Sequence, residues 1–432
     1  MKKGFFTIMA AQFFSSLADN ALLIAAIALL VLMDGPAWLT PLLKWFFTLS
    51  YVLLAFAVGA FADSMPKGRV MFVTNLVKIA GCTMILFSDF LHFGTLAQYW
   101  VIMVGYAVVG LGAAAYSPAK YGILTELLPP EQLVAANGWI EGLTIGSIVT
   151  GFLVGGALIG PKVSAMLLSF DFPFFDTHID TPPEAAIVVI IAFYIVAALF
   201  NLAIPDTGAR YPDQGRNPVK LFLDFSRCFM TLWNDKLGQI SLAVTTLFWG
   251  AGGTLQLLVL RWAEKSLHLP LNQGSALMGV SGFGIAIGAF VAAKYVPLKR
   301  AVHVLPVGIA MGLAVLAMIF THWMPMVLVL LVVVGALGGF FVVPMNALLQ
   351  HRGHVLMSAG HSIAVQNFNE NVSILVMLAL YSLMLRLDLH IHAIIAVFGV
   401  FVSVTMYLVL RWNAANHRAD PHLDRLIGEV KH

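Results

Sequence analysis

Twelve long apolar runs, separated by polar segments, constrain this chain more than any other feature. Each run is about as long as the roughly 20 residues that a helix needs to cross the hydrocarbon core of a bilayer. Only helices and closed barrels satisfy the backbone polar groups in lipid. The sequence therefore predicts an all-α membrane protein with twelve transmembrane helices, at residues 5–33, 41–62, 70–91, 97–119, 132–160, 184–205, 237–262, 272–296, 302–320, 325–350, 356–386 and 390–411.

The composition agrees with a membrane location and excludes several classes of protein. Hydrophobic residues make up 60% of the chain and charged residues only 10%, against about 25% charged in a soluble domain. A disordered chain, a nucleic-acid-binding domain and a soluble enzyme are therefore excluded. The two cysteines, Cys82 and Cys228, have no metal-ligand spacing. We expect no nucleic-acid partner, no metal and no cofactor.

The basic residues indicate the orientation, because cytoplasmic loops carry an excess of Lys and Arg. With the N-terminus inside, 18 of the 24 basic residues fall on the cytoplasmic side. The longest external loop, 161–183, carries three aspartates. The apolar run after Lys2 and Lys3 is too long for a signal peptide, so it is interpreted as the first span. The sequence predicts a multi-pass protein with both termini in the cytoplasm.

A polar linker at 206–236 divides the chain. It is rich in Pro, Gly and charge, and its segment 220–230 alternates apolar and basic residues, which predicts an amphipathic helix on the membrane surface. We expect an N-terminal six-helix bundle at 1–205, a C-terminal six-helix bundle at 237–411 and a cytoplasmic tail at 412–432.

The two halves share short patterns at a nearly constant offset of 226 to 230 residues. The matches are Gly112 and Pro118 with Gly338 and Pro344, Asn137 and Glu141 with Asn367 and Asn371, and Gly59 with Gly288. An even number of spans per half keeps both halves in the same orientation. The sequence therefore predicts a parallel internal repeat, as in one large class of transporters.

The loop between the second and third spans carries Gly59, Asp63, Lys67, Gly68 and Arg69. This pattern resembles the signature loop of the major facilitator superfamily, and the resemblance implies that fold. Glycines permit close helix packing and a tight turn. We interpret Gly59, Asp63, Gly68 and Arg69 as a conformational latch between the bundles. In this latch Asp63 accepts hydrogen bonds from the N-terminus of a neighbouring helix or forms an ion pair with Arg69.

Three carboxylates lie within predicted spans: Asp19, Glu141 and Glu370. Such groups are costly in a membrane, so they face a cavity or a polar partner. Asp19 and Asn20 share a helix face with Ser16, and Gln366, Asn367, Glu370 and Asn371 form a polar stripe. Neither Asp19 nor Glu370 has a basic residue within one turn, which favours a cavity role. For Asn137, Glu141 and Asn371, simple bonding between packed helices is an equal alternative.

Basic residues within spans are scarcer. Lys120 either snorkels to the cytoplasmic interface or faces the cavity and binds an anion, and Lys78 either snorkels or pairs structurally. Arg261 and Trp262 are predicted to anchor the outer end of the seventh span at the membrane interface. No ATP-binding loop and no hydrolase or acyltransferase motif is present, so we expect no enzyme.

Several segments resemble the lysophospholipid transporter family, a bacterial branch of the major facilitator superfamily. They are FFSSLADNALL (13–23), GAAAYSPAKYGILTELLP (112–129), VAANGWIEG (134–142), TLFWGAGGTL (246–255), GALGGFFVVPMNALLQHRG (335–353) and AVQNFNENVSIL (364–375). The resemblance implies a flippase of the bacterial inner membrane that moves lyso-phosphatidylethanolamine and lyso-phosphatidylglycerol from the outer to the inner leaflet. An acyltransferase/acyl-carrier-protein synthetase would then re-acylate them. Because this chain ends at His432, we expect that enzyme to be a separate protein.

The resemblance also implies that Asp19, Lys120 and Glu370 are important. One position departs from the family, which carries an arginine in the seventh span where this chain has Gln256. Arg261 lies five residues later, about 140° round the helix and ~7.5 Å along it, so it does not simply replace that arginine.

We therefore hypothesise that Asp19 and Glu370 bind the amine or hydroxyls of a lysolipid head and that Lys120 binds its phosphate. Asn20, Glu141, Gln366 and Asn367 complete the predicted substrate-binding set. Membrane lipids would surround the protein. Two other functions stay open, namely a proton-coupled exporter of hydrophobic drugs or small metabolites and, less in keeping with the missing motifs, a membrane-embedded lipid enzyme.

Overall fold

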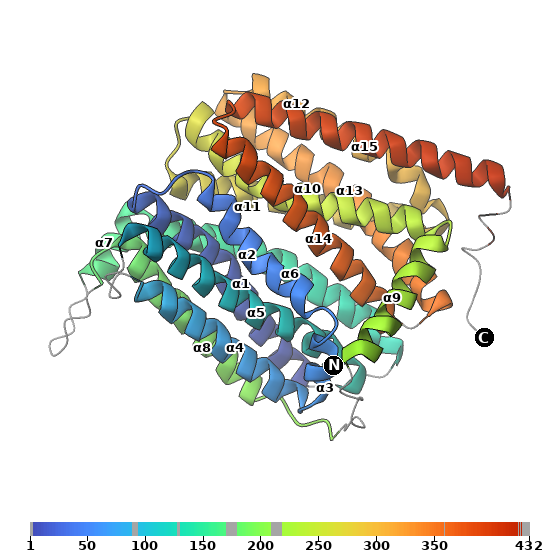
Figure 1. Ribbon diagram of the computed structural model, residues 1–432, viewed down its shortest axis with the longest axis horizontal. Coiled ribbons are helices and arrows are strands. Elements are labelled where there is room, and N and C mark those ends of the chain that lie inside the picture. Colours follow the sequence, from blue (N-terminus) through green and yellow to red (C-terminus); the bar gives the residue numbers. More distant parts are fainter. Residues whose placement is uncertain are drawn as a thin grey trace. The chain divides into compact units, whose positions relative to one another are not determined.

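The computed structural model describes residues 3–88, 94–127, 130–169, 179–208, 218–357, 359–421, 423 and 425 of the 432-residue chain. Throughout these ranges the regular elements are α- or 3₁₀-helices and none is a strand (Figure 1). The predicted all-α fold is therefore confirmed.

The structure groups the chain into two compact units. Unit 1 comprises Met1–Arg216 with Leu269–Gly279, and unit 2 comprises Asn217–His268 with Val280–His432. The helices of unit 1 are α1 (Lys3–Leu32), α2 (Leu39–Leu54), α3 (Val58–Asp63), α4 (Lys67–Leu86), α5 (Thr95–Leu127), α6 (Pro130–Ile159), α7 (Pro161–Leu168) and α8 (Pro182–Leu202).

Helix α11 (Leu271–Tyr295) begins in unit 1 and continues in unit 2. The other helices of unit 2 are α9 (Pro218–Asn234), α10 (Gly238–Ser266), η2 (Leu298–Val304), α12 (Leu305–Ala317), η3 (Met318–Phe320), α13 (Met324–Leu356), α14 (Ala359–Arg386) and α15 (Ile391–Ala419).

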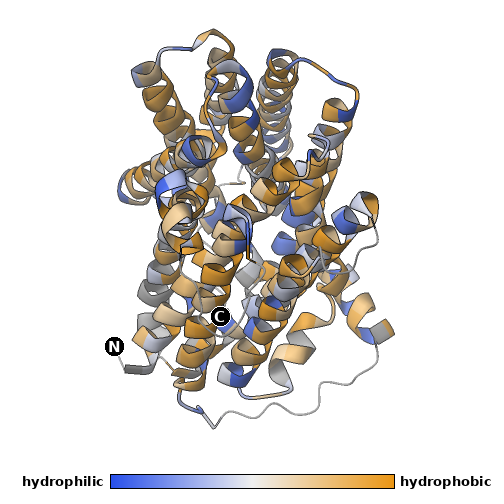
Figure 2. Ribbon diagram, turned by 90° about the vertical axis from the view of Figure 1, so that its left-hand side faces the viewer, coloured by the Kyte–Doolittle hydropathy of each residue, from blue (hydrophilic) through white to orange (hydrophobic). Residues whose placement is uncertain are grey.

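Eleven of the helical segments in the described ranges are long and apolar enough to cross a membrane. The predicted second span, 41–62, corresponds to the 16-residue helix α2 followed by a turn and α3. Apolar residues dominate the helices, and hydrophilic residues gather toward helix ends and loops (Figure 2). Many large apolar side chains are exposed, among them Leu96, Phe290 and Phe320. In a chain of this kind, lipid is the solvent that such surfaces require.

Helix packing within each unit agrees with the predicted internal repeat. In unit 1, α1 packs against α6 and α8, and α4 packs against α5 and α8. In unit 2, α10 packs against α14 and α15, and α12 packs against α13 and α15. These neighbours correspond one to one when the chain is shifted by the offset of the sequence repeat. The two halves therefore have the same internal arrangement.

Glycines allow the closest of these helix contacts. A Cβ atom on Gly81 of α4 would lie 2.6 Å from the carbonyl oxygen of Gly105 on α5. A Cβ on Gly112 of α5 would lie 2.7 Å from Cγ of Lys78 on α4. Larger residues at these positions would push α4 and α5 apart. Since α4 carries Lys78, the same glycines determine how deeply this lysine enters unit 1.

Candidate functional site

Asp19 of α1 lies in a polar cluster inside unit 1. Lys78 Nζ of α4 lies 2.9 Å from Asp19 Oδ1 and 2.8 Å from Oδ2. The hydroxyl of Tyr194, on α8, donates a hydrogen bond of 2.7 Å to Asp19 Oδ1. Three helices therefore converge on one carboxylate, which fixes its position within the bundle.

The lysine of this cluster is itself enclosed by polar and aromatic groups. Lys78 Nζ donates to Ser15 Oγ at 3.0 Å, and Ser15 Oγ donates to Asn75 Oδ1 at 2.8 Å. The ammonium also lies 5.3 Å and 5.5 Å from the ring centroids of Tyr116 and Tyr194, within the range of a cation–π interaction. The Lys78 side chain is 2% exposed and that of Asp19 is 18% exposed.

The cluster corrects one expectation about Asp19. Its charge is neutralised by Lys78, which is 59 residues away in the chain and on another helix. The snorkelling alternative for Lys78 is wrong, and the pairing alternative is confirmed. A basic residue in the middle of a span was the only sequence signal for this partner, and nothing in the sequence singled out Tyr194 or Ser15.

Glu370 of α14 lies in a second polar cluster, inside unit 2. Gln366 Nε2 donates to Glu370 Oε1 at 2.7 Å and to Asn346 Oδ1 of α13 at 3.0 Å. Gln366 and Glu370 are both buried. Gln366 and Glu370 therefore occupy one face of α14, as their spacing of four residues predicts.

Two other predicted binding residues lie apart from these clusters. Asn367 is exposed, and its backbone carbonyl accepts a hydrogen bond of 2.7 Å from Asn371. Asn20 is half-buried and donates to the backbone oxygen of Ser16 at 2.8 Å. On α14, the exposed Asn367 and the buried Glu370 therefore have different surroundings, whereas on α1 Asn20 is half-buried like Asp19.

Lys120 lies on α5, two residues beyond Pro118, and α5 continues through this proline. Its side chain is buried, with the residue 7% exposed. Burial within unit 1 argues against the snorkelling alternative. The side chains of Asn137 and Glu141 lie outside the described residues, so the predicted role of Glu141 stays a prediction.

The loop between α3 and α4 is described only in part, because the side chain of Asp63, the last residue of α3, lies outside the described residues, whereas Gly59 lies within α3. Gly68 lies close to α8, where an added Cβ would be 3.1 Å from the carbonyl oxygen of Asn201. Arg69 is exposed, whereas Lys67 is buried and donates to the Ala62 carbonyl at 2.9 Å. The sequence pattern did not distinguish these two basic residues. The proposed latch stays a prediction.

The outer end of the seventh predicted span differs from expectation. Trp262 of α10 is completely buried, so its predicted role as an interfacial anchor is wrong. Arg261 is 27% exposed in its side chain and pairs with Glu264 at 2.7 Å.

Unit 2 also holds a buried ion pair outside the predicted site. Arg352 of α13 binds Asp235 through two hydrogen bonds, of 3.1 Å and 2.7 Å, with side chains only 3% and 9% exposed. Asp235 also accepts a bond of 2.7 Å from the backbone of Gly238, at the start of α10. The ion pair therefore joins the end of α13 to the beginning of α10. We assign it a structural role.

Helix α9 packs against α10, α13 and α14 in unit 2. Phe225 and Phe229 lie against Phe368 of α14, with their ring centroids 5.3 Å and 6.4 Å from that of Phe368.

The pKa of the Cys228 thiol on α9 is raised because partial burial and the nearby Asp224 disfavour the thiolate. Since the thiolate is the reactive form, Cys228 is not set up as a nucleophile.

Comparison with known proteins agrees with this architecture. The sequence profile of the Major Facilitator Superfamily matches residues 8–377. The lysophospholipid transporter LplT of Yersinia enterocolitica (serotype O:8 / biotype 1B) is 40% identical over 394 residues, which cover 91% of this chain and 90% of that protein. LplT of Yersinia pestis (strain Pestoides F) is 40% identical over 397 residues, with the same coverage.

Solved structures show the same fold at low sequence identity. A bacterial homologue of the human lysosomal transporter Spinster, in an inward-facing and unoccupied conformation, has a TM-score of 0.68 at 16% identity, covering 96% of this chain and 99% of that chain. The nucleoside transporter NupG has a TM-score of 0.69 at 12% identity, covering 95% and 100%. The chain therefore belongs to the Major Facilitator Superfamily and, within it, to the family of the LplT lysophospholipid transporters.

Proposed function

We propose that this protein transports lysophospholipids across the membrane. The observation that carries the proposal is the 40% identity to LplT transporters over nine-tenths of both chains. A lysolipid combines a zwitterionic or anionic head with a single acyl chain. Isolated polar clusters within apolar helical bundles suit such a substrate, because intramembrane ionisable residues mark substrate pathways.

The finer features of the proposal concern direction and location. Transport would run from the outer to the inner leaflet of the bacterial inner membrane, with lyso-phosphatidylethanolamine and lyso-phosphatidylglycerol as substrates. Both termini would be cytoplasmic, as the distribution of Lys and Arg indicates. An acyltransferase/acyl-carrier-protein synthetase would re-acylate the product.

The described contacts suggest different roles for the proposed binding residues. Lys78 holds the carboxylate of Asp19, which remains 18% exposed and so presents only part of its surface to a substrate. Glu370 would bind the amine or hydroxyls of the head, with its carboxylate oriented by Gln366. Lys120 would bind the phosphate. Charge-assisted hydrogen bonds of this kind are about twice as strong as neutral ones.

Uptake of head-group-labelled lysophospholipid by the purified protein in liposomes tests the proposal. We expect uptake by the wild-type protein and a strong loss in the isosteric variant Glu370→Gln. The matched control is Leu380→Met, which alters an exposed residue of the same helix outside the predicted binding set. Wild-type uptake in Glu370→Gln would refute the role of Glu370.

The same preparation separates this function from its rival. Assays with and without an imposed pH gradient, using lysolipids and a hydrophobic drug, compare the two substrate classes. Transport of the drug that depends strictly on the gradient, with no lysolipid uptake, would refute the proposed function and favour a proton-coupled exporter.

A further inference from the structure

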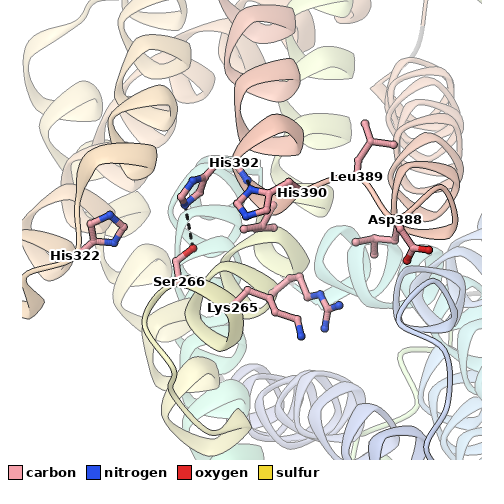
Figure 3. A pocket seen from close by; sticks show the side chains of 10 residues that line it. Lys265, Ser266, His322, Asp388, Leu389, His390 and His392 are labelled. Carbon is pink, nitrogen blue, oxygen red and sulfur yellow. Dashed lines mark hydrogen bonds between the residues drawn. The ribbon is translucent and has the colours of Figure 1, made fainter.

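A cavity of about 400 Å³ lies in unit 2 where α10 and α14 end and α15 begins. Basic and imidazole side chains surround it (Figure 3). The polar residues that line it include Arg261, Lys265, Ser266, His322, His390 and His392. None of them belongs to the predicted substrate-binding set.

Two permanent positive charges of the cavity come from one face of α10. Arg261 and Lys265 are four residues apart, so they are neighbours on the helix surface. Both approach the same carboxylate, since Glu264 lies 2.7 Å from Arg261 Nη1 and 3.5 Å from Lys265 Nζ. A guanidinium carries five N–H donors and an ammonium three, more than one half-exposed carboxylate can accept. The pair therefore retains donors for an anion in the cavity.

Three imidazoles add hydrogen-bonding groups. The ring centroids of His390 and His392 are 4.9 Å apart, and those of His322 and His392 are 6.3 Å apart. His392 Nε2 lies 3.2 Å from Ser266 Oγ, as the dashed line in Figure 3 shows. Among the described residues no group of three His, Cys, Asp or Glu side chains is placed to hold a metal ion. The imidazoles thus add hydrogen-bonding groups beside the two cations of α10.

The remaining lining suits an amphipathic ligand. Leu385, Leu389 and Ile391 supply apolar surface, and Asp388 supplies a carboxylate from the turn between α14 and α15. In a membrane-spanning chain, the ends of the spanning helices lie at the level of the lipid head groups. With both termini in the cytoplasm, this end of α10 faces the outer leaflet.

We propose that this cavity captures the phosphate of a lysophospholipid head at the outer leaflet, before the substrate enters the transport pathway. Arg261 and Lys265 bind the phosphate oxygens, and His390 and His392 supply further hydrogen bonds. The inference rests on the proposed function and orientation. It adds an entry site to the binding residues within the spans.

The test is lysophospholipid uptake into proteoliposomes over a series of substrate concentrations. In the variant Arg261→Gln/Lys265→Gln we expect KM to rise about tenfold, since losing charge-assisted contacts worth about 1.4 kcal/mol weakens binding tenfold. The maximal rate should be retained, because the residues act before translocation. The control is Lys162→Gln, an exposed lysine on the same predicted side of the membrane.

A second variant, His390→Gln/His392→Gln, keeps the test independent of α10. We expect a smaller rise of KM, about threefold, in the folded protein, since neutral hydrogen bonds contribute less than charged ones. If wild-type protein transports lysolipid and both double variants keep the wild-type KM, the capture site is refuted and the proposed function stands. If wild-type protein transports no lysolipid, the proposed function itself fails, and this inference fails with it.

Competition experiments distinguish the two sources of phosphate. Soluble glycerophosphoethanolamine should inhibit wild-type uptake and lose this effect in Arg261→Gln/Lys265→Gln. Inhibition by inorganic phosphate, with none by glycerophosphoethanolamine, would overturn the assignment to a lipid head and identify a site for the free anion.

Discussion

Asp19 and Glu370 are both carboxylates in the middle of apolar helices, yet their surroundings differ. Asp19 is held by the ammonium of Lys78 and the hydroxyl of Tyr194, from two other helices of unit 1. Glu370 accepts a hydrogen bond from Gln366, a neutral amide one turn away on its own helix. An ion pair across helices fixes both the charge and the position of Asp19. The amide of Gln366 holds Glu370 from one turn away on the same helix, whereas the groups that hold Asp19 come from two other helices, so these contacts of the two carboxylates differ in kind.

The largest expected effect comes from Lys78→Met, which leaves the carboxylate of Asp19 without its cation. Removing one partner of a buried ion pair costs about 3–5 kcal/mol, so we expect a marked fall in the thermal unfolding temperature in detergent and loss of lysolipid uptake. Adding Asp19→Asn should recover much of the stability, because it removes the uncompensated charge. An unchanged unfolding temperature in Lys78→Met would contradict the ion pair.

A matched variant tests whether reduced stability alone explains the loss of lysolipid uptake in Lys78→Met. Arg352→Met breaks the other buried ion pair, with Asp235, and should cost about 3–5 kcal/mol in the same way. Since this pair lies outside the proposed site, the folded protein should retain uptake when rates are normalised to the folded fraction. Complete loss of normalised uptake would show that the Asp235 pair also takes part in transport.

An intermediate effect is expected from Gln366→Leu, which removes the amide that joins Glu370 to Asn346. The substitution removes a hydrogen-bond donor from the buried oxygens of Glu370 and Asn346, and leaving a buried acceptor unsatisfied lowers the free energy of unfolding by about 1–3 kcal/mol. We expect a modest loss of stability and a higher KM for lysolipid, because Glu370 is no longer oriented. The variant Gln366→Glu is informative beside it, since a second carboxylate should repel Glu370 and lower uptake further. Wild-type KM in Gln366→Leu would show that Glu370 needs no orienting group.

The smallest effect is expected from Asn367→Ala. This side chain is exposed, and the hydrogen bond from Asn371 goes to the backbone of residue 367, so truncation removes no described contact. Stability should change by less than about 0.5 kcal/mol, and uptake should stay near the wild-type rate. A strong loss of uptake would contradict this expectation and would support the predicted place of Asn367 in the substrate-binding set.

Much of the fold could be predicted from the sequence because lipid imposes a simple rule on each span. An apolar run of sufficient length must form a helix, whatever surrounds it. The repeat offset derived from Gly112, Pro118 and their matches predicted two similar halves, and the helix contacts within each unit agree with it. The turn after α2 was missed, since hydropathy varies little across residues 55–57.

The candidate site was predictable only in part. Intramembrane charge alone drew attention to Asp19, Lys120 and Glu370, but periodicity along one helix cannot identify a partner on another. For the same reason, Trp262 was wrongly placed at the interface, and the places of Asn20 and Asn367 in the substrate-binding set stay predictions.

The sequence by itself determined that this protein spans a membrane, that it consists of two similar helical halves and that few charges are available for function. Hydropathy, length and spacing are local properties, and they suffice for these conclusions. Only the tertiary structure decided that Lys78 neutralises Asp19, that Gln366 connects Glu370 to Asn346 and that Arg261 lines a cavity with three histidines. Each of these depends on which faces of separate helices meet, and in lipid that choice depends on close packing at small residues and on the few polar side chains between helices.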